Sequence, residues 1–172
     1  MALKMNYCMQ CGTKLRPVYH ETEECEIPYC DTCGDYRFPI FNTAVSMIVT
    51  NEEGSRILLI KQYGRPTYIL VAGYVTCGED VEDTVVREVK EEMGLKVTSM
   101  HFNRSHYFKP SNTLMLNFTV KVAGEAPHPN WEIDDWSWFT IPEARDNIRK
   151  GSLAEAFLLG YLDGEYHFPQ GQ

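Results

Sequence analysis

The chain has 172 residues and a formal charge of −8, and 44% of its residues are hydrophobic. This length is sufficient for one full hydrophobic core and a small additional module, which would need a metal ion to fold. The acidic balance argues against binding to double-stranded nucleic acid, because proteins of that class present a basic patch. The sequence contains no apolar run of membrane-spanning length, so we expect no membrane insertion.

A pair of cysteine knuckles lies near the N-terminus. Each knuckle has two cysteines that are separated by two residues and followed by a glycine, and eighteen residues lie between the knuckles. This spacing is typical of a closed structural zinc site, in which four thiolates surround the ion and leave no position open for a substrate. The predicted zinc ligands are Cys8, Cys11, Cys30 and Cys33.

Two disulfides are the alternative arrangement for these cysteines, and they would need an oxidising compartment. The sequence before Cys8 lacks the charged region and the long apolar region of a secretory signal. We therefore expect a reduced, cytoplasmic protein. Cys25 and Cys77 lie outside both knuckles and are expected to be small, half-buried side chains.

The next part of the chain has the composition of β-strands. Residues 43–50 and 56–62 are rich in apolar and β-branched side chains and flank a turn, so they predict a hairpin. Residues 68–72 predict a further strand, which leads into Gly73. A glycine at this point would let the backbone approach a metal ion or a phosphate closely.

Residues 81–93 are predicted to form a helix. Asp80 is a favourable N-cap residue, and Gly94 stands where the helix would end. Valines recur between them at positions i, i+4 and i+8. This periodicity predicts that one face of the helix is buried.

The same helix carries a row of carboxylates. Glu88, Glu91 and Glu92 occupy positions i, i+3 and i+4, so they share one edge of the helix. Arg87 can reach Glu91, but three carboxylates remain against one guanidinium, and a hard divalent cation is the expected partner. The alternative is an acidic helix face that is simply solvated.

The remaining sequence predicts more strands followed by two helices. Residues 141–149 predict a helix, since a proline stands in its first turn. A last helix is predicted to start at Ser152, which forms a capping box with Glu155. The strands are predicted at residues 96–102, 114–122 and 135–139.

Residues 73–95 as a whole fill the pattern G-x5-E-x7-R-E-(apolar)-x-E-E-x-G-(apolar). So many fixed positions are far more specific than a short motif. The segment resembles the Nudix box. This resemblance implies an α+β fold, a Nudix α/β/α sandwich with a mixed sheet. It also implies Mg²⁺- or Mn²⁺-dependent hydrolysis of the pyrophosphate in a nucleoside diphosphate linked to another moiety.

Together with the cysteine knuckles, the box makes nearly the whole chain similar to the NADH pyrophosphatases. Their Y-P-R-x-x-P-A-V stretch matches residues 38–45, which keep the first proline and the Ala-Val pair. Their A-G-F-V-E-x-G-E run matches residues 72–79. The resemblance implies a zinc ribbon at residues 1–38 and a Nudix hydrolase domain at residues 39–172.

The same resemblance implies roles for individual residues. Glu91 or Glu92 would polarise the attacking water, with Glu88 beside them, and Arg87 would orient the acidic cluster. The aromatic residues that would bind the dinucleotide are Tyr74 and Phe108. The implied magnesium ligands are the Ala72 carbonyl, Glu88, Glu92 and Glu132, with Asp134 and Asp135 as alternatives to Glu132.

One stretch departs from this family. Its S-Q-P-W-P-F-P-x-S run corresponds to residues 105–113, which keep the first serine but lose the glutamine and the proline pattern. An NADH- or NAD-like dinucleotide is the expected substrate, and ADP-ribose, FAD and capped RNA stay open beside it. The resemblance also implies a homodimer.

A function of another class is a non-catalytic sensor, in which the Nudix module binds a nucleotide and the zinc ribbon contacts a partner. Such a sensor would not need an intact acidic cluster. The complete box therefore favours the enzyme.

Overall fold

The computed structural model describes residues 5–169, and the chain divides into two compact units between Phe41 and Asn42. The boundary predicted from the sequence lies between residues 38 and 39. Each unit has its own sheet.

The N-terminal unit is a three-stranded antiparallel sheet with the strand order β1-β2-β3. The described part of this unit buries very little apolar surface, because its fully buried hydrophobic side chains are Cys8, Ile27 and Cys30. A core of this size is too small to stabilise a fold without additional cross-links. The strands are β1 (Arg16–His20), β2 (Cys25–Cys30) and β3 (Asp35–Tyr36).

The four knuckle cysteines supply that cross-link. Their Sγ atoms all lie within 4.8 Å of one another, with 3.9 Å between Cys8 and Cys33 and 3.4 Å between Cys11 and Cys30. These distances exceed the length of a disulfide, about 2.05 Å. They match a tetrahedral ion whose bonds to sulfur are about 2.3 Å long. The arrangement therefore fits one metal ion and not the two-disulfide alternative.

The glycine after each knuckle has a structural reason. Gly12 and Gly34 adopt φ values of 75° and 67°, a region that glycine enters without steric cost. Each glycine N–H donates a hydrogen bond of 2.8 Å to the carbonyl of the first cysteine of its knuckle, Cys8 or Cys30. The turn thereby brings both thiols of a knuckle to the same side.

Arg37 adds a positive charge beside the cluster. Its Nε donates to Cys8 Sγ at 3.2 Å. Burial raises the pKa of Cys8, but this bond from Arg37 and nearby backbone N–H groups outweigh burial and lower that pKa to about 6. The neighbouring thiols raise the pKa of Cys33 to about 12. Without a cation, Cys8 and Cys33 therefore do not ionise together.

The two remaining cysteines are more open to solvent than we expected. Cys25 and Cys77 are both exposed, and the expectation of half-buried side chains is wrong. Cys25 is the first residue of β2, directly after the turn that joins β1 and β2, and Cys77 stands in the turn before α1. Neither position has enough chain around it to cover a side chain.

The C-terminal unit is built on a mixed six-stranded sheet. The strand order is β7-β8-β4-β5-β9, and β6 pairs with β4 off this path. β4 and β8 run parallel, whereas the other pairs run antiparallel. The strands are β4 (Asn42–Thr50), β5 (Arg56–Gln62), β6 (Val71–Tyr74), β7 (Lys96–Phe108), β8 (Thr113–Ala123) and β9 (Ile133–Thr140).

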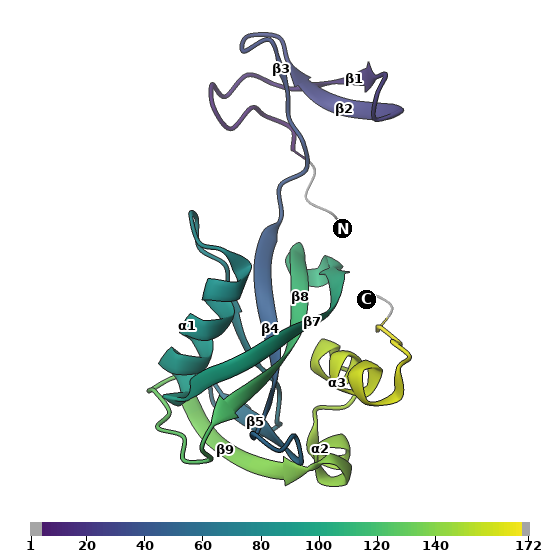
Figure 1. Cartoon of the computed structure of the whole chain (residues 1–172). Coiled ribbons are helices and arrows are strands. Elements are labelled where there is room, and N and C mark those ends of the chain that lie inside the picture. The colour runs from purple at the N-terminus through teal and green to yellow at the C-terminus, as the bar shows by residue number, and fades with distance from the viewer. Residues whose placement is uncertain (1–4, 170–172) are drawn as a thin grey trace. The chain divides into compact units, whose positions relative to one another are not determined.

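Helices cover both faces of this sheet (Figure 1). Successive residues of β4 point to opposite faces: Met47 packs beneath α1 with Val89, whereas Ile48 packs on the other side with Phe157. This is the α/β/α sandwich with a mixed sheet, as predicted. The helices are α1 (Val81–Met93), α2 (Ile141–Asn147) and α3 (Leu153–Asp163), with a 3-10 turn at Lys109–Ser111. Among residues 5–169, none of the helices has the length and apolar character needed to cross a membrane.

The predicted hairpin forms, but its strands pair only next to the turn. Val49 faces Leu58 and Thr50 faces Ile57, and no further pairs join β4 and β5 in the described structure. The first half of β4 pairs instead with β6, and β5 pairs along its length with β9. Local composition predicts strands, but it carries no information about these distant partners.

Two strands, β6 and β7, differ from the prediction by more than two residues at one end. β7 continues to Phe108 instead of ending at Phe102, with register shifts between Val97 and Ser99 and between Phe102 and Arg104. Gly73 lies inside β6, opposite Val45, and not in a loop after the strand. Its position in the sheet fixes the backbone at the point where α1 approaches.

The cysteine geometry predicts that the N-terminal unit depends on zinc. Replacement of Cys30, which is fully buried, by Ser should abolish stoichiometric zinc and unfold this unit, because zinc contributes on the order of 10 kcal/mol to small modules. The C-terminal unit has two hydrophobic cores of its own and should stay folded. Metal analysis and amide hydrogen exchange measure both effects.

The matched control is Cys25→Ser, since Cys25 is exposed and lies outside the cluster. This variant should keep one zinc ion per chain. A Cys30→Ser protein that keeps one tightly bound zinc ion would contradict the assignment.

Candidate functional site

Helix α1 presents its acidic edge because its opposite face is locked into the core. Val85, Val89 and Met93 are fully buried against the sheet. Gly94 ends the helix at φ 66° and donates its N–H to the Lys90 carbonyl. Asp80 stands at the predicted N-cap position, but its side chain makes no capping hydrogen bond.

Arg87 is the centre of the acidic edge. Its Nε and Nη2 bind both carboxylate oxygens of Glu79 at 2.7 and 3.0 Å, and Nη1 binds Glu88 at 2.7 Å and Glu91 at 3.1 Å. Nη2 also donates to the Tyr74 carbonyl at 3.1 Å. These bonds lower the pKa of Glu79 and raise that of Arg87, so both groups stay charged.

Glu92 is the unusual member of the cluster. It is only 4% exposed, and its Oε2 is buried without a hydrogen-bond partner among the described residues. Burial, and then the charges of Glu88, Glu132 and Glu91, raise its pKa to about 8. A buried carboxylate oxygen without a donor costs about 1–3 kcal/mol or more, so this position calls for a cationic partner.

Gly73 explains how Glu88 reaches the same place. A Cβ atom at Gly73 would lie 2.0 Å from Glu88 Cδ, far inside van der Waals contact. Glu88 thus lies directly over the backbone of β6, next to Ala72. Burial raises the pKa of Glu88, although Arg87 partly offsets this effect.

Glu132 comes from the turn directly before β9. Tyr63 donates its hydroxyl hydrogen to Glu132 at 2.9 Å, and this bond raises the pKa of Tyr63. The two alternative acids lie elsewhere: Asp134 accepts from the Gly64 N–H at 2.6 Å, and Asp135 pairs with a lysine. Of the three, only Glu132 lines the cavity described next.

A cavity of about 520 Å³ opens over these residues. Most of the predicted site residues gather on its wall, and Tyr74, which is 58% exposed, stands at its rim. Phe108 does not reach this cavity and lines a neighbouring one. The predicted site residues on the wall are Ala72, Tyr74, Arg87, Glu88, Glu91, Glu92 and Glu132.

The carboxylates share one wall, but their oxygens are not drawn to one point. Among the described residues, the only group of three or more acidic, cysteine or histidine ligands within 4.8 Å is the cysteine cluster. The carboxylates stay apart because other side chains hold them by hydrogen bonds: Arg87 binds Glu88 and Glu91, and Tyr63 binds Glu132. The wall has the donor chemistry of a hard-cation site, namely several carboxylates and an orphaned oxygen.

Two residues of the site were not predicted. Glu79 belongs to the box, yet its role as the two-pronged partner of Arg87 depends on the fold of the turn before α1. Tyr63 lies outside every motif, and its positive φ of 57° marks a tight turn only once the structure is known. No local sequence pattern indicates its contact with Glu132.

Comparison with known proteins agrees with this architecture. The NUDIX domain model matches residues 41–157. The NAD-capped RNA hydrolase NudC of Pseudomonas aeruginosa (strain LESB58) is 34% identical over 159 residues, which make up 91% of this chain and 55% of that protein. The protein of the same name from Vibrio atlanticus (strain LGP32) is 27% identical over 166 residues, covering 95% and 60%. The chain spans about half the length of the curated relatives it matches.

Solved structures resemble the fold. A NUDIX hydrolase from Nitrosomonas europaea superposes with a TM-score of 0.61 at 18% identity, over 97% of this chain and 98% of that one. The NUDIX domain of Shewanella oneidensis NrtR, complexed with ADP ribose, gives 0.59 at 15% identity, over 79% and 91%. With the box, the sandwich and the matched domain model in agreement, the chain belongs to the Nudix domain family.

Proposed function

We propose that this chain is a metal-dependent hydrolase that cleaves the pyrophosphate of a nucleoside diphosphate linked to another moiety. An NADH- or NAD-like dinucleotide is the proposed substrate. The observation that carries this proposal is the orphaned oxygen of Glu92, which is buried among other carboxylates at the wall of a cavity. The names of the curated relatives, hydrolases of NAD-capped RNA, support an NAD-type pyrophosphate.

The proposed metal ligands are Glu88, Glu92, Glu132 and the Ala72 carbonyl. When bound, Mg²⁺ or Mn²⁺ would neutralise phosphate oxygens and lower the pKa of a water molecule. The cysteine cluster is proposed to hold a structural zinc ion, which takes no part in the reaction.

The remaining roles in positioning, proton transfer and substrate binding are assigned to side chains of this chain. Arg87 holds Glu88 and Glu91 in place through charge-assisted bonds, which are stronger than neutral ones. Glu91 has a side chain that is 57% exposed, so it is open to a water molecule and is a candidate to accept its proton, with Glu92 as the alternative. Tyr74 offers an exposed ring at the cavity rim for stacking on a base or a nicotinamide.

The sensor alternative predicts nucleotide binding without turnover. The test is incubation of the full chain with Mg²⁺ and NADH or NAD, followed by mass spectrometry of the products. Hydrolysis should give AMP and the nicotinamide mononucleotide. Tight binding of the dinucleotide with no product formed would favour the sensor.

Replacement of Glu92 by Gln should separate catalysis from folding. We expect kcat to fall by about 100-fold or more, because a charged ligand and candidate base is lost. The control is Glu82→Gln on the same helix, since Glu82 is exposed and does not line the cavity. This control should keep its activity. A Glu92→Gln enzyme with full activity would overturn the site assignment.

The same variant should change the pH dependence of stability in metal-free protein. The pKa of Glu92 is raised to about 8 in the folded state, so folded protein binds a proton that the unfolded chain releases near pH 4.5. The free energy of unfolding should therefore fall as pH rises from about 4.5 to 8. Glu92→Gln should remove this slope and raise stability near pH 8 by about 4 kcal/mol, as measured by urea denaturation.

Replacement of Gly73 by Ala tests the close approach of Glu88. The added methyl group would collide with the Glu88 carboxylate, whose carbon lies 2.0 Å from the new Cβ, and would push it aside. We expect kcat/KM to fall at least about tenfold at a given Mg²⁺ concentration. Thermal melting serves as the control for folding. Unchanged kinetics would show that the position of Glu88 does not matter.

A homodimer and a reducing, cytoplasmic setting remain predictions of the sequence. Light scattering coupled to size-exclusion chromatography would measure the mass of the particle. A monomer at micromolar concentration would contradict the first of these predictions.

A further inference from the structure

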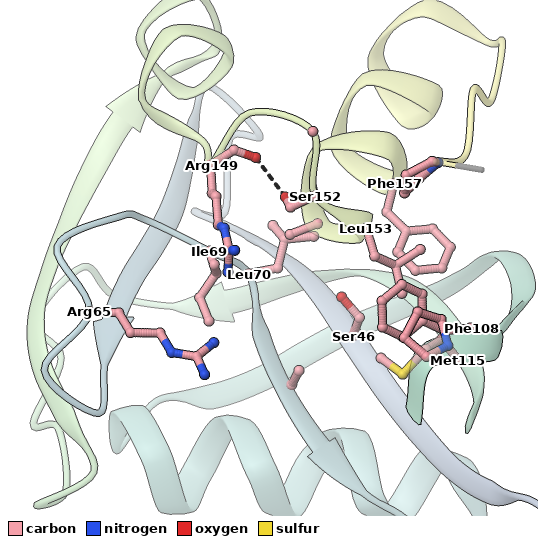
Figure 2. A pocket seen from close by; sticks show the side chains of 15 residues that line it. Ser46, Arg65, Ile69, Leu70, Phe108, Met115, Arg149, Ser152, Leu153 and Phe157 are labelled. Atoms are coloured by element: carbon pink, nitrogen blue, oxygen red, sulfur yellow. Dashed lines mark hydrogen bonds between the residues drawn. The ribbon is translucent and has the colours of Figure 1, made fainter. Parts of the chain in front are cut away.

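A second cavity, of about 470 Å³, adjoins the acidic one. Ala72 and Met115 line both cavities, so these two residues form the border between them. Figure 2 shows side chains from several elements of the C-terminal unit gathered around this space. A molecule whose pyrophosphate lies over α1 would have one of its ends beside this border.

One end of the second cavity is apolar. Phe108, Met115, Leu153 and Phe157 lie together on one side of the space in Figure 2. The Phe108 ring can stack on a planar base, and the apolar side chains around it exclude water. This end therefore suits the base of a nucleoside.

The other end is basic. Arg65 and Arg149 lie on the opposite side of the space in Figure 2, and both line the cavity. Among the described residues, no aspartate or glutamate lines it, although the chain has 24 of these residues. The two cavities thus have opposite charge, because four glutamates line the first.

These two guanidinium groups differ from the others in the chain. Five of the eight arginines pair with carboxylates, and Arg104 lies over the Tyr166 ring. Within residues 5–169, the side chains of Arg65 and Arg149 form neither kind of contact. In a chain of net charge −8, two arginines left without a partner at one cavity indicate an anionic ligand.

Backbone hydrogen bonds hold Arg149 at the basic end of the second cavity. Its N–H donates to the Tyr68 carbonyl at 2.9 Å, and its own carbonyl accepts from the Ser152 hydroxyl at 2.6 Å, which Figure 2 marks with a dashed line. Ser152 is in turn the N-cap of α3. The position of Arg149 is therefore fixed by two elements before any ligand arrives.

We propose that the second cavity takes a nucleoside of the substrate and that Arg65 and Arg149 bind a further phosphate on its ribose. This inference rests on the proposed function, because it places the pyrophosphate over α1. The base would lie at the apolar end and the extra phosphate at the basic end. Dinucleotides with a 2′- or 3′-phosphate should be preferred over otherwise identical ones without it.

Two matched pairs of compounds test this preference and distinguish a 2′-phosphate from a 3′-phosphate. NADPH differs from NADH by a ribose 2′-phosphate, and coenzyme A differs from dephospho-coenzyme A by a 3′-phosphate. We expect kcat/KM to be about tenfold higher for the phosphorylated member of at least one pair, since a hydrogen bond to a charged group contributes that much. The pair that responds identifies the position of the phosphate.

The variant Arg65→Gln/Arg149→Gln should bring this ratio to about one. The control is Lys150→Gln, which removes a neighbouring positive charge that does not line the cavity and should leave the ratio unchanged. A ratio near one in the unaltered chain, or a ratio that the double variant keeps, would overturn the inference.

A failure of this inference can be told apart from a failure of the proposed function. If no compound is hydrolysed, the proposed hydrolase activity is wrong, and the dissociation constants of the same pairs of compounds then test the inference. A preference for the phosphorylated member that depends on the two arginines would support it. Equal binding, or no binding, would reject it.

Discussion

One guanidinium group organises the acidic wall of this protein. Arg87 uses its five N–H donors on Glu79, Glu88, Glu91 and the Tyr74 carbonyl, so the turn before α1, the helix and the end of β6 are tied at a single point. Glu92 lies about one helical turn after Glu88 and is left out of this network. The Glu92 carboxyl is therefore buried with a raised pKa, and a cation is the natural complement of its ionised form.

The two units of the chain differ in what stabilises the fold around their clusters of metal-binding side chains. In the N-terminal unit, four thiols converge within the reach of one ion, and the described residues beside them form almost no apolar core. In the C-terminal unit, two hydrophobic cores carry the stability, so a cluster of acids at the edge of the sheet can be tolerated. The first arrangement suits an ion that holds the fold together, whereas the second suits an ion that comes with a substrate.

Much of the fold and of the acidic site could be predicted from the sequence, because the sequence patterns that indicate them are local. The knuckle spacing fixes which cysteines can converge, and the i, i+3, i+4 spacing fixes which carboxylates share the edge of α1. The partners of β4, the contact between Tyr63 and Glu132, and the rim formed by Arg65 and Arg149 could not be predicted. Each of these features depends on contacts between segments that are far apart in the chain, and local sequence periodicity does not indicate such contacts.

The register shifts in β7 have a consequence for the protein in concentrated solution. β7 is the outer strand of the large sheet, and with 13 residues it is long enough to pair with a strand of another chain. Two interruptions of its register bend and twist the strand. A strand with such breaks is a poor template for edge-to-edge aggregation, so the irregularities protect the sheet against fibril-like association.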